Sequence, residues 1–197
     1  MKGIYSKLII TILAAITIST SLGGSVATKK QDKPADLPAE LSQLNIKLLK
    51  PIKGVSRTFA QLDRDYANRL ISVFIVMKQQ YGYDMTMLEG YRSPERQDSL
   101  SSSVTQAKSF QSYHQYGMAS DCAFMKNGKL MTDPKDPWTM KGYKLLGEVA
   151  KSVGLVWGGN WTLKDYGHTE FHAPKAVYAM NTMRKIGYRS PSAVAAL

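Results

Sequence analysis

One ten-residue segment, from Ser112 to Asp121, limits how this chain can fold. It places His114 and Asp121 on the two sides of Gly117, a residue at which the chain can turn sharply. Imidazole nitrogen and carboxylate oxygen are both zinc ligands, and a catalytic zinc site uses three protein ligands and a water. The segment therefore predicts two ligands of a metal site and requires the fold to bring a third from elsewhere.

The other two histidines of the chain lie close together near the C-terminus. His168 and His172 follow a segment with two tryptophans, residues 157–161. We expect the fold to return His168 to His114 and Asp121, so that the three side chains surround one metal ion. We expect His172 to be a partly buried structural histidine.

The chain has a single cysteine, Cys122, directly after Asp121. One thiol cannot form a disulfide within the chain. Neighbouring residues of a strand face opposite sides of a sheet. If Asp121 faces the metal, Cys122 is therefore expected to be a small core residue and not a ligand.

The N-terminus has the pattern of a secretory signal. Lys2 and Lys7 precede an apolar run over residues 8–18, and small or hydroxyl-bearing residues follow as far as Ala27. A membrane-spanning helix needs about 20 apolar residues, and this apolar run is shorter. We expect residues 1–27 to be a signal peptide, with an uncleaved N-terminal anchor as the alternative, and the protein to be exported to the periplasm or the cell exterior.

The net charge of the chain is +11 at pH 7. Such a surface favours polyanions, and an exported protein meets anionic cell-wall polymers and membrane surfaces first. No run of five or more basic residues marks a nucleic-acid-binding tail. We expect no nucleic-acid partner and a monomeric protein, and the N-terminal segment leaves room for transient association with a membrane.

Apolar periodicity, capping residues and turn signals predict one domain over residues 38–197, after a linker at residues 28–37. An Asn-Gly pair in residues 126–129 is typical of a type I′ hairpin turn. Strands and helices do not alternate as βαβ units, so the predicted fold class is α+β, with helices packed around a small, mainly antiparallel sheet that carries the zinc site. The predicted helices are at residues 37–49, 56–80, 94–100, 136–152 and 174–185, and the predicted strands are at residues 84–89, 119–125, 130–131, 155–157 and 168–172.

Further polar groups suit the chemistry of a metal-activated water. Asp165 lies three residues before His168, so its carboxylate can reach that water and act as a general base. Glu170, two residues after His168 on the same strand face, is the alternative base. Arg92 follows a predicted strand and a glycine, and its guanidinium can stabilise charge on an attacked carbonyl or bind a carboxylate. The candidates for substrate binding are Ser112, Gln97 and Tyr166.

Together these motifs resemble a known family. The pattern Ser-x-His-x-x-Gly-x-Ala-x-Asp is complete at residues 112–121, Gly-Tyr-Arg-Ser stands at residues 90–93, and Trp-Gly-Gly-Asn-Trp followed by Asp-x-x-His stands within residues 157–168. The family comprises the zinc D-alanyl-D-alanine carboxypeptidases and dipeptidases of the VanY and VanX type and the related L-alanyl-D-glutamate endopeptidases of phage endolysins. The chain is more similar to the endolysin branch, and the similarity covers roughly residues 59–171.

The resemblance implies one Zn²⁺ per chain on His114, Asp121 and His168. It implies Asp165 as the general base and Arg92 as the residue that binds substrate and stabilises the oxyanion. The implied activity is hydrolysis of peptidoglycan stem peptides, of the L-alanyl-D-glutamate endopeptidase type. A D-Ala-D-Ala carboxypeptidase is the first alternative. The second is a non-catalytic, zinc-stabilised module that binds the cell wall, although structural zinc sites are usually closed by four protein ligands.

Two residues depart from the family pattern. Gly167 stands where many relatives have proline, and Thr169 follows the last ligand where many have phenylalanine. Glycine has more backbone freedom than proline, so we expect a looser backbone at His168 and a weaker site.

Overall fold

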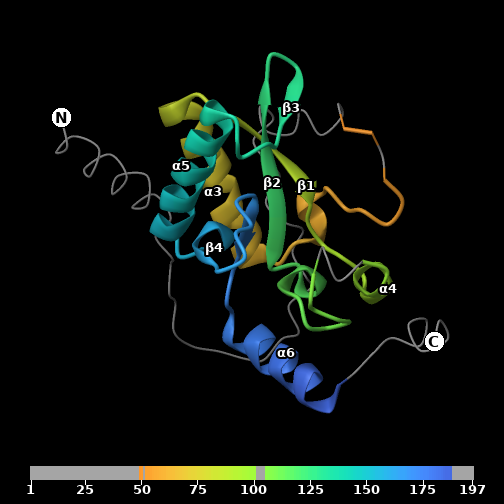
Figure 1. Cartoon of the computed structure of the whole chain (residues 1–197). Helices are drawn as coiled ribbons and strands as arrows, with labels where there is room; N and C mark the ends of the chain where they lie inside the picture. The colour runs from red at the N-terminus through yellow and green to blue at the C-terminus, as the bar shows by residue number, and fades with distance from the viewer. Residues whose placement is uncertain (1–48, 51, 101–104, 188–197) are drawn as a thin grey trace, which may run out of the picture. The chain divides into compact units, whose positions relative to one another are not determined.

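The computed structural model describes residues 49–50, 52–100 and 105–187 (Figure 1). These residues all belong to one compact unit, residues 33–197. The predicted signal peptide and linker, and all but the last residue of the helix predicted at residues 37–49, lie outside the described residues. In the part of the chain that the structure describes, no helix combines the length and the apolar character needed to cross a membrane.

A five-stranded antiparallel sheet lies at the centre of the described residues (Figure 1). Its second strand is the longest and pairs with three others, so the order is β1-β2-β5-β4 with β3 also on β2. This arrangement confirms the predicted α+β class. The strands are β1 (Asp84–Glu89), β2 (Ala119–Lys126), β3 (Lys129–Met131), β4 (Val156–Trp157) and β5 (His168–Glu170).

Two long helices cover one face of this sheet. Helix α3 (Arg64–Tyr81) packs against α5 (Pro137–Ser152), and their apolar faces form the main core with β1 and β2. The remaining helical elements surround the end of β2 at which the strand begins, near Ala119. They are η2 (Phe59–Gln61), α4 (Pro94–Asp98), η3 (Tyr113–Tyr116), η4 (Gly158–Asn160) and α6 (Pro174–Ile186).

The helix predicted over residues 56–80 begins later than expected. The side chain of Asp63 accepts hydrogen bonds from the backbone N–H groups of Asp65 and Tyr66, which makes Asp63 the N-cap of α3. Residues 59–61 form a separate short turn, η2. The apolar periodicity therefore identified the buried face of the helix. It continues across the cap at Asp63, however, so it did not show where the helix begins.

The other predicted elements agree with the structure to within a few residues. Residues 84–89 form the predicted strand, and Ser93 caps α4 as expected before Pro94. Asn127 and Gly128 both have positive φ angles, 50° and 73°, which a type I′ turn requires. The strands β4 and β5 are shorter than predicted, because the pairing of β4 begins only at Val156 and that of β5 ends at Glu170.

Candidate metal centre and cleft

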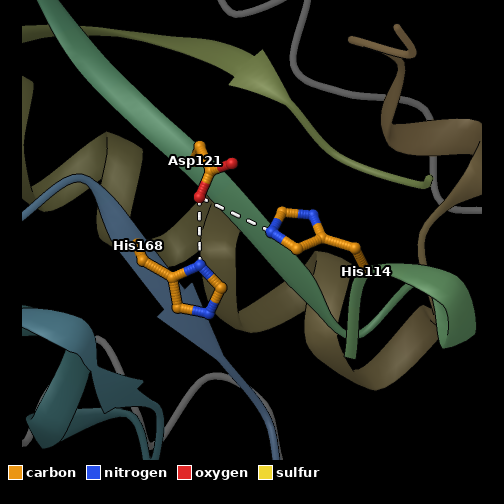
Figure 2. A group of neighbouring side chains, drawn as sticks. All are labelled: His114, Asp121 and His168. Atoms are coloured by element: carbon orange, nitrogen blue, oxygen red, sulfur yellow. Dashed lines mark hydrogen bonds and ion pairs between the residues drawn. The ribbon is translucent and has the colours of Figure 1, made fainter. Parts of the chain in front are cut away.

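Three side chains from separate segments meet at one end of β2 (Figure 2). His114 comes from η3, Asp121 from β2 and His168 from β5, and one potential ligand atom from each lies within 4.8 Å of the others. Oδ1 of Asp121 is 3.5 Å from Nε2 of His114 and 3.0 Å from Nδ1 of His168. Both imidazoles point toward this carboxylate in Figure 2, so the structure brings together the three predicted ligands.

The local backbone explains why these residues converge. Asp121 and His168 are register partners in the antiparallel β2–β5 pair. Gly117 ends η3 with a φ of +66° and turns the chain into β2, which returns His114 to Asp121. A Cβ atom at Gly117 would lie only 2.8 Å from backbone atoms of residues 61 and 63. The turn therefore requires glycine both for its conformation and for its packing.

Hydrogen bonds fix which nitrogen each ring offers. Nδ1 of His114 lies 2.7 Å from the carbonyl oxygen of Gly90, so this nitrogen donates and Nε2 is left to face Asp121. Nε2 of His168 lies 3.1 Å from Oε2 of Glu170, so Nδ1 is left to face Asp121. Two imidazole nitrogens and one carboxylate oxygen suit zinc, and hydrogen bonds of this kind are typical of ligand histidines. The donor set therefore fits the expected ion.

The protonation of Asp121 and that of His168 depend on each other. Although burial acts to raise the pKa of Asp121, the charge and hydrogen bonds of His114 and His168 hold that pKa well below its usual range. Burial acts to lower the pKa of His168, but hydrogen bonds to Asp121 and Glu170 outweigh it and raise the pKa to about 10. Binding of a metal ion at Nδ1 must therefore displace a proton.

A cleft of about 400 Å³ opens over this cluster. Its lining includes the three ligand candidates together with Arg92, Ser112 and Asp165. Gln97 and Tyr166 are not among the described residues that line it, and their role in substrate binding stays a prediction. The lining also includes Trp161, from the tryptophan segment. Two further lining residues, Leu163 and Arg184, were not singled out from the sequence.

Arg92 is a buried part of the cleft floor and not a free surface cation. Its Nη2 atom lies 2.6 Å from Glu89 Oε2 and 3.3 Å from Asp121 Oδ2. Gln97, itself only 1% exposed, accepts a hydrogen bond from Nη1 at 3.2 Å. Gln97 therefore orients Arg92 from behind. Nε of Arg92 is buried and has no hydrogen-bond partner among the described residues.

Asp165, the predicted general base, is one of the residues that line the cleft. Two hydrogen bonds hold the backbone of its loop: Asp165 N donates to the carbonyl oxygen of Gly158 at 3.2 Å, and the Asp165 carbonyl accepts from His168 N at 3.3 Å. Asp165 is exposed as a residue, but partial desolvation of its carboxylate, followed by the charge of Asp121, raises its pKa. Glu170, the alternative base, is instead occupied by hydrogen bonds from His168 and His172.

Gly158 is a positioning residue that sequence reasoning missed. A Cβ atom there would lie 2.6 Å from the Asp165 carbonyl oxygen and 3.1 Å from Cβ of His168. The loop that carries Asp165 can approach β5 this closely only because Gly158 has no side chain. The Trp-Gly-Gly sequence marked a turn, but the spacing along the chain did not reveal which segment would pack on it.

Tyr166 belongs to the framework of this loop. Its carbonyl oxygen accepts a hydrogen bond from Nε1 of Trp157 at 2.8 Å, and its ring packs near that of Tyr143 in the main core. Tyr166 therefore ties the loop to the core.

Gly167, from which a looser backbone at His168 is expected, packs closely against Cys122 of β2. The Gly167 carbonyl accepts a hydrogen bond from the N–H of Cys122 at 2.9 Å, and a Cβ at Gly167 would lie 2.5 Å from the Cys122 carbonyl oxygen. This strand contact is too close for a side chain. Cys122 is fully buried, as predicted, and burial raises the pKa of its thiol to about 12.

Thr169 takes part in a buried polar network behind the ligands. The hydroxyl of Tyr66, on α3, lies 2.6 Å from Oγ of Ser120 and 2.9 Å from Oγ1 of Thr169. Ser120 and Thr169 are register partners next to Asp121 and His168. The network therefore fastens the two ligand strands to α3. Sequence analysis missed it because Tyr66 was only one member of an apolar stripe.

Comparisons with known proteins agree with the family resemblance. Residues 105–171 match the family model described as D-alanyl-D-alanine carboxypeptidase, a segment that contains the three ligand candidates and Asp165. The chain is 36% identical over 102 residues to the peptidoglycan L-alanyl-D-glutamate endopeptidase CwlK of Bacillus subtilis strain 168, an alignment that covers 45% of this chain and 61% of that relative. These matches confirm the predicted resemblance and support a peptidase.

The solved structures to which the chain is similar include two peptidases. One is the L-Ala D-Glu endopeptidase ChiX of Serratia marcescens, with 19% identity, a TM-score of 0.45, and coverage of 73% of this chain and 98% of that chain. Another is the vancomycin resistance D,D-pentapeptidase VanY, solved in complex with Zn(II), with 15% identity, a TM-score of 0.44, and coverage of 80% and 93%.

Proposed function

Starting from the match of residues 105–171 to the D-alanyl-D-alanine carboxypeptidase family, we propose that this protein is a zinc-dependent peptidase that hydrolyses peptidoglycan stem peptides outside the cytoplasmic membrane. One observation carries the proposal. His114, Asp121 and His168 converge on the floor of an open cleft, and Asp165 lies on the wall of the same cleft. The segment predicted to direct export, residues 1–27, would bring the domain to this substrate.

The metal would be held by Nε2 of His114, Oδ1 of Asp121 and Nδ1 of His168. When bound there, zinc would supply a Lewis acid that lowers the pKa of a coordinated water to about 7. The cluster found among the described residues has three members, whereas structural zinc sites usually have four protein ligands. This difference favours a catalytic site over a purely structural one.

Asp165 would act as the general base. The pKa of its carboxyl is raised toward neutral pH. A carboxylate accepts a proton more effectively, and the resulting acid donates it more effectively, when its pKa lies closer to the operating pH. It would take a proton from the attacking water and give it to the leaving amine. Glu170 is less suited to this role, because each of its two oxygens already accepts a hydrogen bond from a histidine.

Arg92 would stabilise the charge that develops on the attacked carbonyl. Glu89 and Gln97 hold its guanidinium rigidly at the cleft floor. Its contact with Asp121 is longer than that with Glu89, 3.3 against 2.6 Å, so an incoming oxyanion would compete with the weaker of the two. A preorganised cation of this kind is one of the larger contributions to catalysis.

The bond that we propose is that between L-Ala and D-Glu of the stem peptide. The similarity to the Bacillus subtilis endopeptidase supports this choice. The test is incubation of the zinc-loaded protein with a purified muropeptide that carries a complete stem, followed by mass spectrometry. The expected result is a muramyl fragment that keeps L-Ala and a released peptide that begins with D-Glu. Loss of only the terminal D-Ala would replace the endopeptidase by a carboxypeptidase, and an intact stem would contradict both.

A further inference from the structure

The hydrogen bonds of Glu170 continue beyond His168 to a third histidine. We propose that Tyr113, His172 and Glu170 form a positioning chain for His168, which makes Nδ1 of that ring the nitrogen offered to the metal. This inference rests on the proposed zinc site and concerns residues that the chemistry described so far does not use. It replaces the expectation that His172 is a partly buried structural histidine.

Each oxygen of the Glu170 carboxylate has one imidazole partner. Oε2 accepts from Nε2 of His168 at 3.1 Å, and Oε1 accepts from Nε2 of His172 at 2.5 Å. Glu170 is only 8% exposed, so water does not compete freely for either oxygen. Two donors on two different oxygens fix the plane of the carboxylate, and this plane sets the direction of its bond to His168.

The His172 end of the positioning chain is held by stacking on Tyr113. The ring of His172 lies 4.6 Å from that of Tyr113, with an angle of 11° between the two planes. Tyr113 is buried and packs with Ala119, Ala176 and Met180, so it offers a fixed surface. The His172 side chain is 46% exposed, so stacking, and not burial, restrains its ring.

The positioning chain matters because His168 can form a hydrogen bond with Asp121 that competes with metal binding. With a proton on Nδ1, the ring can donate to Asp121 Oδ1, which lies only 3.0 Å away. The two ligands would then be bonded to each other and not to a metal. A proton held on Nε2 by Glu170 favours the tautomer in which Nδ1 carries the lone pair. Partners that fix the ligand tautomer in this way typically contribute 10- to 100-fold to metal affinity.

The chain also joins the two ends of the metal centre. Tyr113 directly precedes His114 in η3, and His172 lies two residues beyond the end of β5, which carries His168. The two segments therefore touch at the ligand rings, whose centroids are 5.1 Å apart, and again at the stacked pair. Any displacement of η3 would reach His168 by both contacts.

Two substitutions of His172 separate stacking from hydrogen bonding. His172→Phe keeps an aromatic ring on Tyr113 but has no N–H for Glu170, whereas His172→Gln keeps an N–H donor and loses the stacked ring. Lys175→Gln changes an exposed charge nearby and is the matched control. The measurement is the zinc dissociation constant of the full chain, obtained by competition with a chromophoric chelator, with thermal unfolding of the metal-free variants as a check on folding.

We expect His172→Phe to weaken zinc binding by about tenfold, at the lower end of the range for such partners. His172→Gln should lie between His172→Phe and the wild type, and Lys175→Gln should stay within twofold of the wild type. NMR of the zinc-loaded protein supplies a second readout, the Nε2–H proton of His168. This proton should be protected from exchange in the wild type and exchange faster in His172→Phe.

Unchanged zinc affinity together with an unchanged Nε2–H resonance in a folded His172→Phe variant would overturn the inference and leave the proposed function standing. Failure of the wild-type protein to bind zinc would instead overturn the proposed function, and this inference with it. If His172→Phe does not fold, His172→Gln decides the question by the same two readouts.

Discussion

At the scale of single residues, every predicted ligand is oriented by another group. A backbone carbonyl holds His114, Glu170 holds His168, and Arg92 contacts the second oxygen of Asp121. Such outer contacts reduce the freedom of the ligand side chains before a metal arrives. The site is thus preorganised, and loss of one ligand should not be compensated by its neighbours.

Substitution of His114 tests the ligand set. His114→Ala removes one of three ligand atoms and leaves Asp121 with His168 alone, so we expect stoichiometric zinc binding to be lost. Metal analysis after gel filtration measures this, and circular dichroism checks that the variant is folded. A variant that still holds one zinc per chain would exclude this ligand set.

Substitution of Asp165 tests the base separately from the metal. Asp165→Asn removes proton acceptance but none of the three ligand atoms. We expect zinc content to remain at one per chain and kcat on the stem peptide to fall by roughly 10²- to 10⁴-fold. Asp133→Asn, at an exposed turn, is the control and should keep the wild-type rate. A wild-type rate in Asp165→Asn would transfer the role to another group.

At the scale of secondary-structure elements, the proposed metal centre depends on how β2 and β5 pair. Their three-residue ladder contains both the ligand pair and the Ser120–Thr169 pair that binds the Tyr66 hydroxyl. Ligands and network face opposite sides of the sheet, because neighbouring strand residues alternate. Helix α3 therefore supports the site through a contact on the far face.

Removal of this hydroxyl should destabilise the fold. Tyr66→Phe leaves two buried hydroxyl groups short of a partner, and we expect the free energy of unfolding to fall by about 1–3 kcal/mol. Tyr178→Phe removes a hydroxyl from a ring that is 77% exposed, and it should change stability by less than about 0.5 kcal/mol. Urea denaturation of both variants measures the difference. Equal stabilities would mean that the network adds nothing to the β2–β5 pair.

The elements that the sequence predicted well are those with local signals. Pro94 after a serine cap, the Asn127–Gly128 turn and the apolar stripe of α3 each depend on neighbours within a few residues. The convergence of His114, Asp121 and His168 was also predictable, because these residue types and their spacing are typical of a metal site. Helix α3 was extended too far at its start because the cap at Asp63 left the periodicity unbroken.

The parts that sequence reasoning missed depend on contacts between distant segments. Tyr66 reaches Thr169 across 103 positions, and nothing near either residue records that bond. The tight packing of Gly167 on Cys122 likewise arises only once β5 lies beside β2.

At the scale of the whole molecule, the metal should stabilise the described unit. His168 lies 47 positions from Asp121 in the chain and meets Asp121 and His114 only when the chain is folded, so zinc would bind the folded state preferentially. At a free zinc concentration 100 times the dissociation constant, the expected gain is about 2.7 kcal/mol in the free energy of unfolding. Thermal unfolding with and without a chelator measures it. His114→Ala should unfold at the same temperature in both conditions.

A zinc titration of metal-free protein on purified peptidoglycan tests the central claim most directly. Cleavage is followed by mass spectrometry of the released stem peptides, and metal content is measured in the same samples. The account predicts no cleavage without metal, a rise in rate that saturates at one zinc per chain, and no recovery in His114→Ala. Cleavage at full rate by metal-free protein would contradict it, as would an inert wall in the presence of protein that holds one zinc.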